Sequence, residues 1–216
     1  MTPLDLEASS NGRTADFGSV YEGSNPSASA HAGPPANLRA ELRAHRRPAR
    51  VLLVALGDVR RRLLHDVGRT LADALGLASA SGPSLERPQY AFNEARRQYH
   101  ASAILRRLAA LRAGAAGAPV LGIADVDLFV PDAPWVLGDA DRAAGAAVVS
   151  VARLADGDLQ RRDLRARVEA VHEAGHLLGL DHCPEPGCAM HLSTEPGEVD
   201  RKAPALCRAC RAALGP

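Results

Sequence analysis

The sequence has few aromatic residues, a single lysine and almost no net charge, and these shortages argue against nucleic-acid and membrane-surface binding. Phe, Tyr and Trp make up 3% of the 216 residues, which leaves few rings to stack on bases. The formal net charge is +1, so no overall field draws the chain toward nucleic acid or an anionic membrane. Lys202 is the only lysine, and arginine supplies the rest of the formal positive charge.

Long apolar stretches are also missing. No run of about 18 apolar residues is present, so we expect no membrane-spanning helix. The N-terminus lacks a basic stretch followed by an apolar one, so we expect no secretory signal. The sequence therefore predicts a cytoplasmic protein with no membrane partner, and we expect it to be a monomer.

Residues 1 to about 35 carry no pattern typical of a folded element, and residues 36–47 could form a short arginine-rich helix that leads into the domain. Asn11 to Pro35 is rich in Gly, Ser, Pro, Asn and Ala, with no apolar repeat of 2 or 3.6 residues. Gly23-Ser24-Asn25-Pro26 is what the T-arm of a transfer RNA gene would encode if it were translated, which suggests a true start further downstream. We expect residues 1–47 to be a disordered extension, or absent from the native protein, and residues 48–216 to form one catalytic domain.

The apolar pattern of residues 48–178 predicts an α/β (α+β) upper part with a mixed sheet. Continuous apolar runs and short β-rich stretches predict strands at Val51–Leu56, Pro119–Ala124, 126–130, 135–138 and 146–153. Helical periodicity predicts long helices at 59–75, 91–113 and 161–178, the last with Leu164, Val168, Val171 and Leu178 facing inward. We expect loops at 76–88 and 139–145.

Three polar residues in this part resemble site residues only weakly. Asp125 and Asp127 could form a metal pair, but we interpret them as polar residues at strand ends. His100 has no partner at helical spacing, so we expect a histidine at the surface or at the rim of a cleft.

The strongest signal runs from His172 to His182 and reads H-E-x-x-H-x-x-G-x-x-H. On a helix, His172 and His176 leave the same face and can hold one metal ion. Gly179 can adopt the left-handed conformation that ends a helix, so the chain can turn and bring His182 back as a third ligand. Three histidines leave one position of a zinc ion open, as in catalytic sites.

Glu173 is placed to act as a base and not as a ligand. It lies about 100° further round the helix than His172, where its carboxylate can reach a water bound to the metal. Zinc-bound water has a pKa of about 7, so Glu173 can take its proton at neutral pH. The alternative is an amphipathic helix with incidental histidines, and the coincidence of five fixed positions argues against it.

All four cysteines follow this motif. Cys183, Cys188, Cys207 and Cys210 form a C-x4-C and a C-x2-C pair, which in a reducing cytosol is typical of a four-thiolate metal site, zinc first and iron second. A disulfide pair or free thiols are the alternative. Because Cys183 directly follows His182, a metal held there would fix the loop that presents the third histidine. We infer that it staples a lower part, residues 179–216, too small to build its own core.

Two residues after Cys188 stands Met190, either an incidental core residue or one packed beneath the three histidines in a tight turn. Together the histidine motif, this methionine and the cysteine pattern resemble the metzincin clan of zinc peptidases, and within it the archaemetzincin family. The similarity covers about Val51 to Ala213, including Gln98-Tyr99 in the second predicted helix and Ser150 to Leu154.

The resemblance implies a metzincin-like zincin domain with two zinc ions. The catalytic zinc would lie on His172, His176 and His182, with Glu173 as general base, and Met190 would be the methionine-turn residue. A structural zinc would lie on the four cysteines. The expected function is that of a zinc-dependent metallopeptidase, endopeptidase or aminopeptidase, which hydrolyses peptide or protein substrates through a zinc-bound water activated by Glu173.

Two functions of another class remain as alternatives. One is a catalytically silent, zinc-dependent peptide-binding module, which would have no need of Glu173. The other is a nucleic-acid-binding protein that uses the cysteine site with Arg201, Lys202, Arg208 and Arg211, against which the charge and the few aromatics argue. No cysteine precedes the motif to cap the zinc, and no tyrosine follows Met190 closely as an extra ligand. His191 stands there instead, a candidate for substrate contact.

Overall fold

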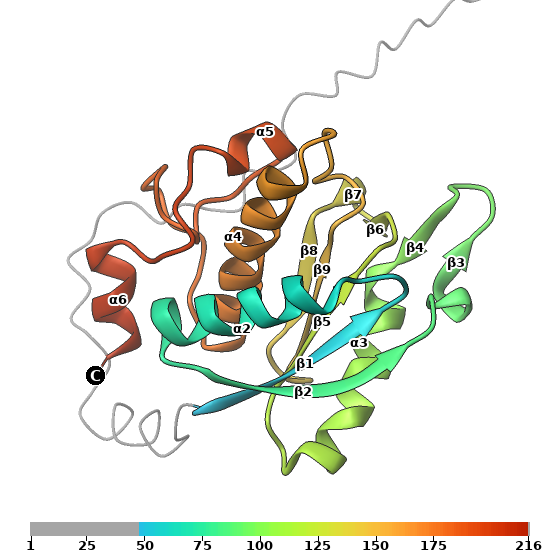
Figure 1. Ribbon diagram of the computed structural model, residues 1–216, viewed down its shortest axis with the longest axis horizontal. Helices are drawn as coiled ribbons and strands as arrows, with labels where there is room; N and C mark the ends of the chain where they lie inside the picture. Colours follow the sequence, from blue (N-terminus) through green and yellow to red (C-terminus); the bar gives the residue numbers. More distant parts are fainter. Residues whose placement is uncertain (1–47, 216) are drawn as a thin grey trace, which may run out of the picture. The chain divides into compact units, whose positions relative to one another are not determined.

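A computed structural model of the chain describes residues 48–215, and our expectations for residues 1–47 lie outside this range. The main sheet has five strands in the order β2-β1-β5-β9-β8 (Figure 1). Its strands are β1 (Arg50–Leu56), β2 (Ala78–Leu85), β5 (Val120–Ala124), β8 (Gly138–Asp141) and β9 (Ala146–Ser150). The first four in this order are parallel, and β8 runs antiparallel to β9 at one edge.

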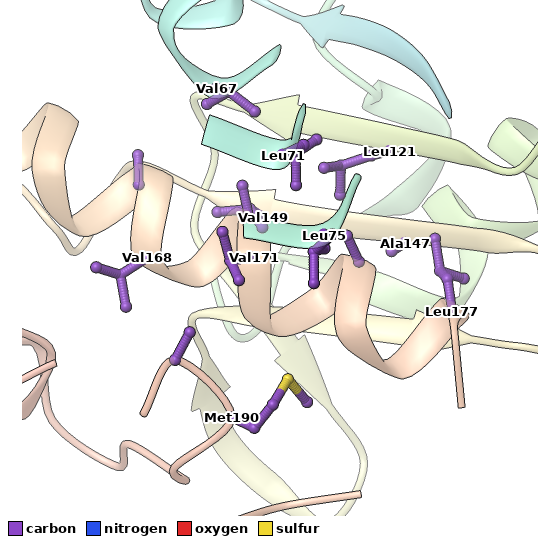
Figure 2. Packing of buried hydrophobic residues seen from close by; sticks show 14 of the residues in the cluster. Val67, Leu71, Leu75, Leu121, Ala147, Val149, Val168, Val171, Leu177 and Met190 are labelled. Carbon is purple, nitrogen blue, oxygen red and sulfur yellow. The ribbon is translucent and has the colours of Figure 1, made fainter. Parts of the chain in front are cut away.

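Helices cover both faces of this sheet, and successive strand residues point alternately to one face and the other. On one face α2 (Arg61–Leu75) and α4 (Leu159–Leu177) lie against each other. Figure 2 shows Leu71 and Leu75 of α2 packed among Leu121, Val149 and Val171. On the opposite face, α3 (Ala101–Ala110) buries its own leucines against the intervening strand residues. The predicted α/β fold with a mixed sheet is confirmed.

A second, smaller sheet replaces part of the long helix that we predicted for residues 91–113. Its strands, in the order β3-β4-β6-β7, are β3 (Phe92–Asn93), β4 (Gln98–His100), β6 (Leu128–Val130) and β7 (Ala133–Val136). Two 3-10 helices flank α3, namely η1 (Gln89–Ala91) and η2 (Leu111–Ala115).

The helix prediction was wrong for residues 91–100, where the chain turns tightly between β3 and β4, and it is confirmed for residues 101–110. The Asn93 side chain accepts a hydrogen bond from the Arg96 backbone at 3.0 Å, and Arg97 adopts a φ of 55°. Gln98 then donates to Asp127 at 3.0 Å and to the Pro134 carbonyl at 2.9 Å, which holds β4 in the second sheet. These partners lie about thirty or more positions along the chain, so no local pattern reveals them.

Three further strand boundaries differ from expectation. The predicted loop at 76–88 contains β2, an exposed edge strand whose Ser, Gly and Pro residues carry no apolar alternation. The stretch after β5 does not continue that strand, since β6 belongs to the second sheet. The predicted connection at 139–145 begins with β8, the short edge strand.

Helix α4 begins and ends where its sequence predicts. Asp158 caps its N-terminus by accepting hydrogen bonds from Gln160 at 2.8 Å and Arg161 at 3.2 Å. Gly179 follows its end with a φ of 90°, the left-handed conformation expected there. Leu164, which we predicted to face inward, is 42% exposed, because the buried side of the helix includes the charged residues Arg165 and Glu169.

The C-terminal part has little regular structure beyond α5 (Pro196–Val199) and α6 (Arg208–Leu214). Its buried side chains join the same apolar cluster as α4, and they include Leu180, Met190, Val199 and Leu206. Two segments of this part, 187–189 and 203–205, are joined by backbone hydrogen bonds. They run from Ala189 to Ala205 and from Ala203 to Gly187, and both are 3.0 Å long. Over residues 48–215, no helix is long and apolar enough to cross a membrane.

Candidate active site

The three histidines of the motif converge at the C-terminal end of α4. Their ring centroids lie 4.6 to 5.2 Å apart, and one ring nitrogen of each falls within 4.8 Å of the others. His172 is buried, His176 is half-buried and His182 is exposed, so the cluster is open on one side. The turn at Gly179 therefore does bring His182 back to the two helical histidines.

Hydrogen bonds fix the tautomers of two of these rings. His172 donates from Nδ1 to the Ala189 carbonyl at 2.8 Å, and His176 donates from Nδ1 to the Leu180 carbonyl at 2.8 Å. Burial lowers the pKa of His172 to about 3, so this ring is neutral at physiological pH. The Nε2 atom of His172 must then carry a lone pair and no proton.

The Nε2 atoms of His172 and His176 lie 3.0 Å apart, so a single cation can contact both of them. Tetrahedral zinc with bonds of about 2.0 Å would hold two nitrogens about 3.3 Å apart, so the rings fit zinc after a shift of a few tenths of an ångström. Carbonyls that orient ligand imidazoles in this way are typical of metal sites.

Glu173 is buried beside this cluster, against the edge strand β8. A Cβ atom added to Gly138 would lie 2.7 Å from the Glu173 carboxyl carbon, so the glycine makes room for the carboxylate. Burial raises the pKa of Glu173 well above its usual range, and the nearby charges of Glu169 and Asp139 raise it further. Burial likewise raises the pKa of Asp139, the next residue of β8.

Met190 is fully buried against α4, which both of our interpretations of this residue allow. Its sulfur and methyl group pack against Gly175, which lies between the two helical histidines, and an added Cβ there would come 3.1 Å from the methyl carbon. The Met190 carbonyl accepts a hydrogen bond from the Cys183 backbone at 2.9 Å. The methionine thus connects the histidine platform to the cysteine loop.

The four cysteines converge in a second cluster, with their sulfur atoms within 4.8 Å of one another and no disulfide among them. Cys183 and Cys207 are 3.7 Å apart, and Cys188 and Cys210 are 3.8 Å apart. Tetrahedral zinc with bonds of about 2.3 Å to sulfur would place thiolates about 3.8 Å apart, so the spacing fits.

Backbone N–H groups also surround these sulfurs, as thiolates require. Cys183, Cys188 and Cys207 accept hydrogen bonds at 3.5, 3.3 and 3.4 Å from the backbones of Glu185, Cys207 and Cys210 respectively. The bond from the Cys210 backbone lowers the pKa of Cys207 to about 7, whereas burial raises the pKa of Cys183 and of Cys210. The donor set and its spacing, and not these pKa values, suit a divalent ion bound by four thiolates.

Sequence reasoning missed a buried ion pair next to the histidines. The Lys202 ammonium donates to Glu169 at 3.0 Å, and the two side chains are 0% and 5% exposed. Lys202 also donates to the carbonyls of His191 at 2.8 Å and Ala189 at 3.4 Å. Because Lys202 is buried, it cannot take part in the nucleic-acid surface considered as an alternative. The one hint in the sequence that Lys202 has a special place is that it is the only lysine.

The weaker candidates have structural partners. Asp125 pairs with Arg87 at 2.7 Å and Asp127 with Arg153 at 2.6 Å, which agrees with polar residues at strand ends. His100 is half-buried against Phe129, with ring centroids 4.9 Å apart. His191 donates to the Cys183 carbonyl at 2.9 Å, and its contact with substrate stays a prediction.

Comparison with known proteins points to one family. Residues 56–215 match the family described as Peptidase family M54. An archaemetzincin of Methanopyrus kandleri is 38% identical over 140 residues, 65% of this chain and 79% of its own length. One of Halobacterium salinarum is 35% identical over 171 residues, 75% of this chain and 97% of its own.

Solved structures agree with this match. The crystal structure of the Methanopyrus kandleri archaemetzincin has a TM-score of 0.68 at 32% identity, covering 79% of this chain and 95% of that one. A zinc-dependent peptidase from Methanocorpusculum labreanum has a TM-score of 0.70 at 28% identity, covering 76% and 100%. The chain therefore belongs to Peptidase family M54, the archaemetzincin family of zinc metallopeptidases.

Proposed function

We propose that His172, His176 and His182 hold a catalytic zinc ion and that Glu173 is the general base for peptide-bond hydrolysis. The observation that carries this proposal is the convergence of three imidazole rings, with a backbone carbonyl behind each of the two helical ones. We further propose that Cys183, Cys188, Cys207 and Cys210 hold a second, structural zinc. Membership of the family supports zinc-dependent peptidase chemistry.

Glu173 has the position and environment that a proton carrier needs. Zinc, when bound, supplies a Lewis acid that polarises the scissile carbonyl and acidifies water. The buried carboxylate of Glu173 takes the proton of the attacking water and then gives it to the leaving amine. Its raised pKa makes Glu173 a stronger base toward the attacking water and lets it keep the proton until the peptide bond breaks.

The edge strand β8 offers a place for the substrate backbone. It pairs with β9 on one side, and within residues 48–215 no strand pairs with its other side. Gly138 of β8 lies directly against Glu173. An extended peptide that added to this edge by backbone hydrogen bonds would run past the base and the histidines.

The test combines metal analysis with a peptide-library cleavage assay on the wild type and Glu173→Gln. We expect two zinc ions per chain in both proteins and hydrolysis only in the wild type, with turnover at least about 100-fold lower in the variant. Glu94→Gln, at an exposed glutamate, should keep full activity. Cleavage positions in the library separate endopeptidase from aminopeptidase action.

Two other results would overturn the proposal. Near-normal hydrolysis by zinc-loaded Glu173→Gln would remove Glu173 as the base. A wild type that binds zinc and peptides without cleaving any would favour the silent binding module.

A further inference from the structure

The ammonium of Lys202 lies at the centre of a buried hydrogen-bond network under the three histidines. It touches one carboxylate, Glu169 of α4, and two backbone carbonyls, those of Ala189 and His191. These two carbonyls lie on either side of Met190, so Lys202 holds the methionine turn at both ends. No other charged side chain within residues 48–215 makes this contact.

One of those carbonyls is shared with a proposed zinc ligand. Ala189 accepts from His172 Nδ1 at 2.8 Å and from Lys202 at 3.4 Å. The position of this carbonyl sets both the tautomer and the ring orientation of His172. A group that fixes the carbonyl therefore fixes the ligand.

We infer that Lys202 is a positioning residue for catalysis: it clamps the methionine turn so that the Ala189 carbonyl holds His172 in its metal-binding orientation. This inference depends on the proposed function of the histidines. Glu169 has a different part in the network, because it balances the buried positive charge and does not touch the turn.

The two roles can be separated because an ion pair and a pair of carbonyl contacts respond differently to apolar replacement. A buried ion pair replaced on both sides by apolar residues of similar volume often leaves stability unchanged. Both carbonyls would still lose the bond from Lys202, and the Ala189 carbonyl would keep only its bond from His172. Stability should then recover in the double variant while the histidine site stays impaired.

The experiment compares Lys202→Met, Glu169→Gln and the double variant Glu169→Leu/Lys202→Met with the wild type. Zinc affinity of the histidine site is measured by chelator competition, with cysteine-site zinc present, and its geometry by cobalt(II) absorption. The thermal unfolding temperature, kcat and KM of each variant are also measured. Asp200→Asn is the matched control, since Asp200 joins the same segment to α4 through Arg165 at 2.6 Å without touching the turn.

We expect Lys202→Met to lower the unfolding temperature and the double variant to restore it. Both should bind histidine-site zinc about tenfold more weakly, with an altered cobalt spectrum and a loss in kcat greater than any change in KM. Glu169→Gln and Asp200→Asn should keep the wild-type spectrum and affinity. A double variant with wild-type affinity and spectrum would overturn the inference.

If the double variant does not fold, the single variants still decide. Glu169→Gln keeps the lysine on the carbonyls, so an equal loss of zinc affinity in Glu169→Gln and Lys202→Met would also refute the clamp. Failure of the proposed function looks different, because the wild type itself would then bind zinc only at the cysteines or cleave no peptide.

Discussion

Gly138 lies in close contact with the Glu173 side chain, with no room for a Cβ atom between them. A Cβ at position 138 would come within 2.7 Å of both Cγ and the carboxyl carbon of Glu173, so the whole carboxylate would have to move. We predict that Gly138→Ala keeps both zinc ions and lowers kcat roughly 10- to 100-fold, since displacement of about 1 Å can cost this much.

Steady-state kinetics and metal content measure this effect. Gly197→Ala is the control, because a Cβ there would meet no atom within 4 Å. Unchanged kcat in Gly138→Ala would mean that the carboxylate does not need its present position.

At the residue scale, spacing alone located the metal-binding candidates. His172 and His176 are about one helical turn apart, and Gly179 ends the helix so that His182 can return to them. The convergence of the three rings could therefore be predicted from the sequence. Lys202 and Glu169 could not be found in this way, because they lie 33 positions apart and belong to no periodic pattern. Their partnership arises only when the C-terminal part folds back onto α4.

At the element scale, the loop from His182 to Met190 depends on the cysteine cluster for its position. We predict that Cys207→Ala weakens zinc binding at the histidines and lowers the unfolding temperature, although Cys207 is not among the histidine-site ligands. Chelator competition and thermal unfolding measure the two effects. Full retention of both values would show that the loop is held without the second metal.

A second prediction at this scale concerns Asp125, which joins the ends of β1, β2 and β5. It accepts from Arg87 at 2.7 Å and from the Asp58 backbone at 2.8 Å. Burial opposes ionisation of Asp125, but these donors outweigh it, and its pKa lies below the usual 3.8. A lowered folded-state pKa gives stability that is complete above the unfolded pKa and lost as pH falls through the folded value.

We therefore predict that Asp125→Asn is less stable than the wild type at neutral pH, by about 1 to 3 kcal/mol. The difference should be constant above about pH 5 and shrink below about pH 4. Unfolding of both proteins by urea across this range, each without metal so that zinc loss does not interfere, measures it. A difference that grows on acidification would contradict the assignment.

The sequence predicted well the elements that bury apolar residues of their own, because these residues form a recognisable local pattern. Strands β1, β5 and β9 are buried on both faces and read as apolar runs, and α2 shows a helical period. Strand β2 is a polar edge strand recognised only through its pairing with β1, and β4 is held by side chains of distant residues. Such elements depend on tertiary contacts that a local pattern does not contain.

At the scale of the molecule, all seven proposed metal ligands lie within residues 48–215, the part of the chain that the structure describes. We predict that a chain beginning at residue 48 binds two zinc ions, cleaves the same peptides and unfolds within about 3 °C of the full chain. Calorimetry and the cleavage assay compare the two. Aggregation or loss of activity on truncation would show that the preceding residues belong to the functional unit.

His182 and Cys183 are neighbours in the chain, yet each faces a different cluster. One peptide unit would therefore couple the two metal sites that we propose, and linkage would make their influence mutual. Whatever factor an ion at the cysteines adds to the affinity of the histidines, an ion at the histidines adds to the affinity of the cysteines. Loss of metal from either cluster would then weaken the hold of the other cluster on its own ion.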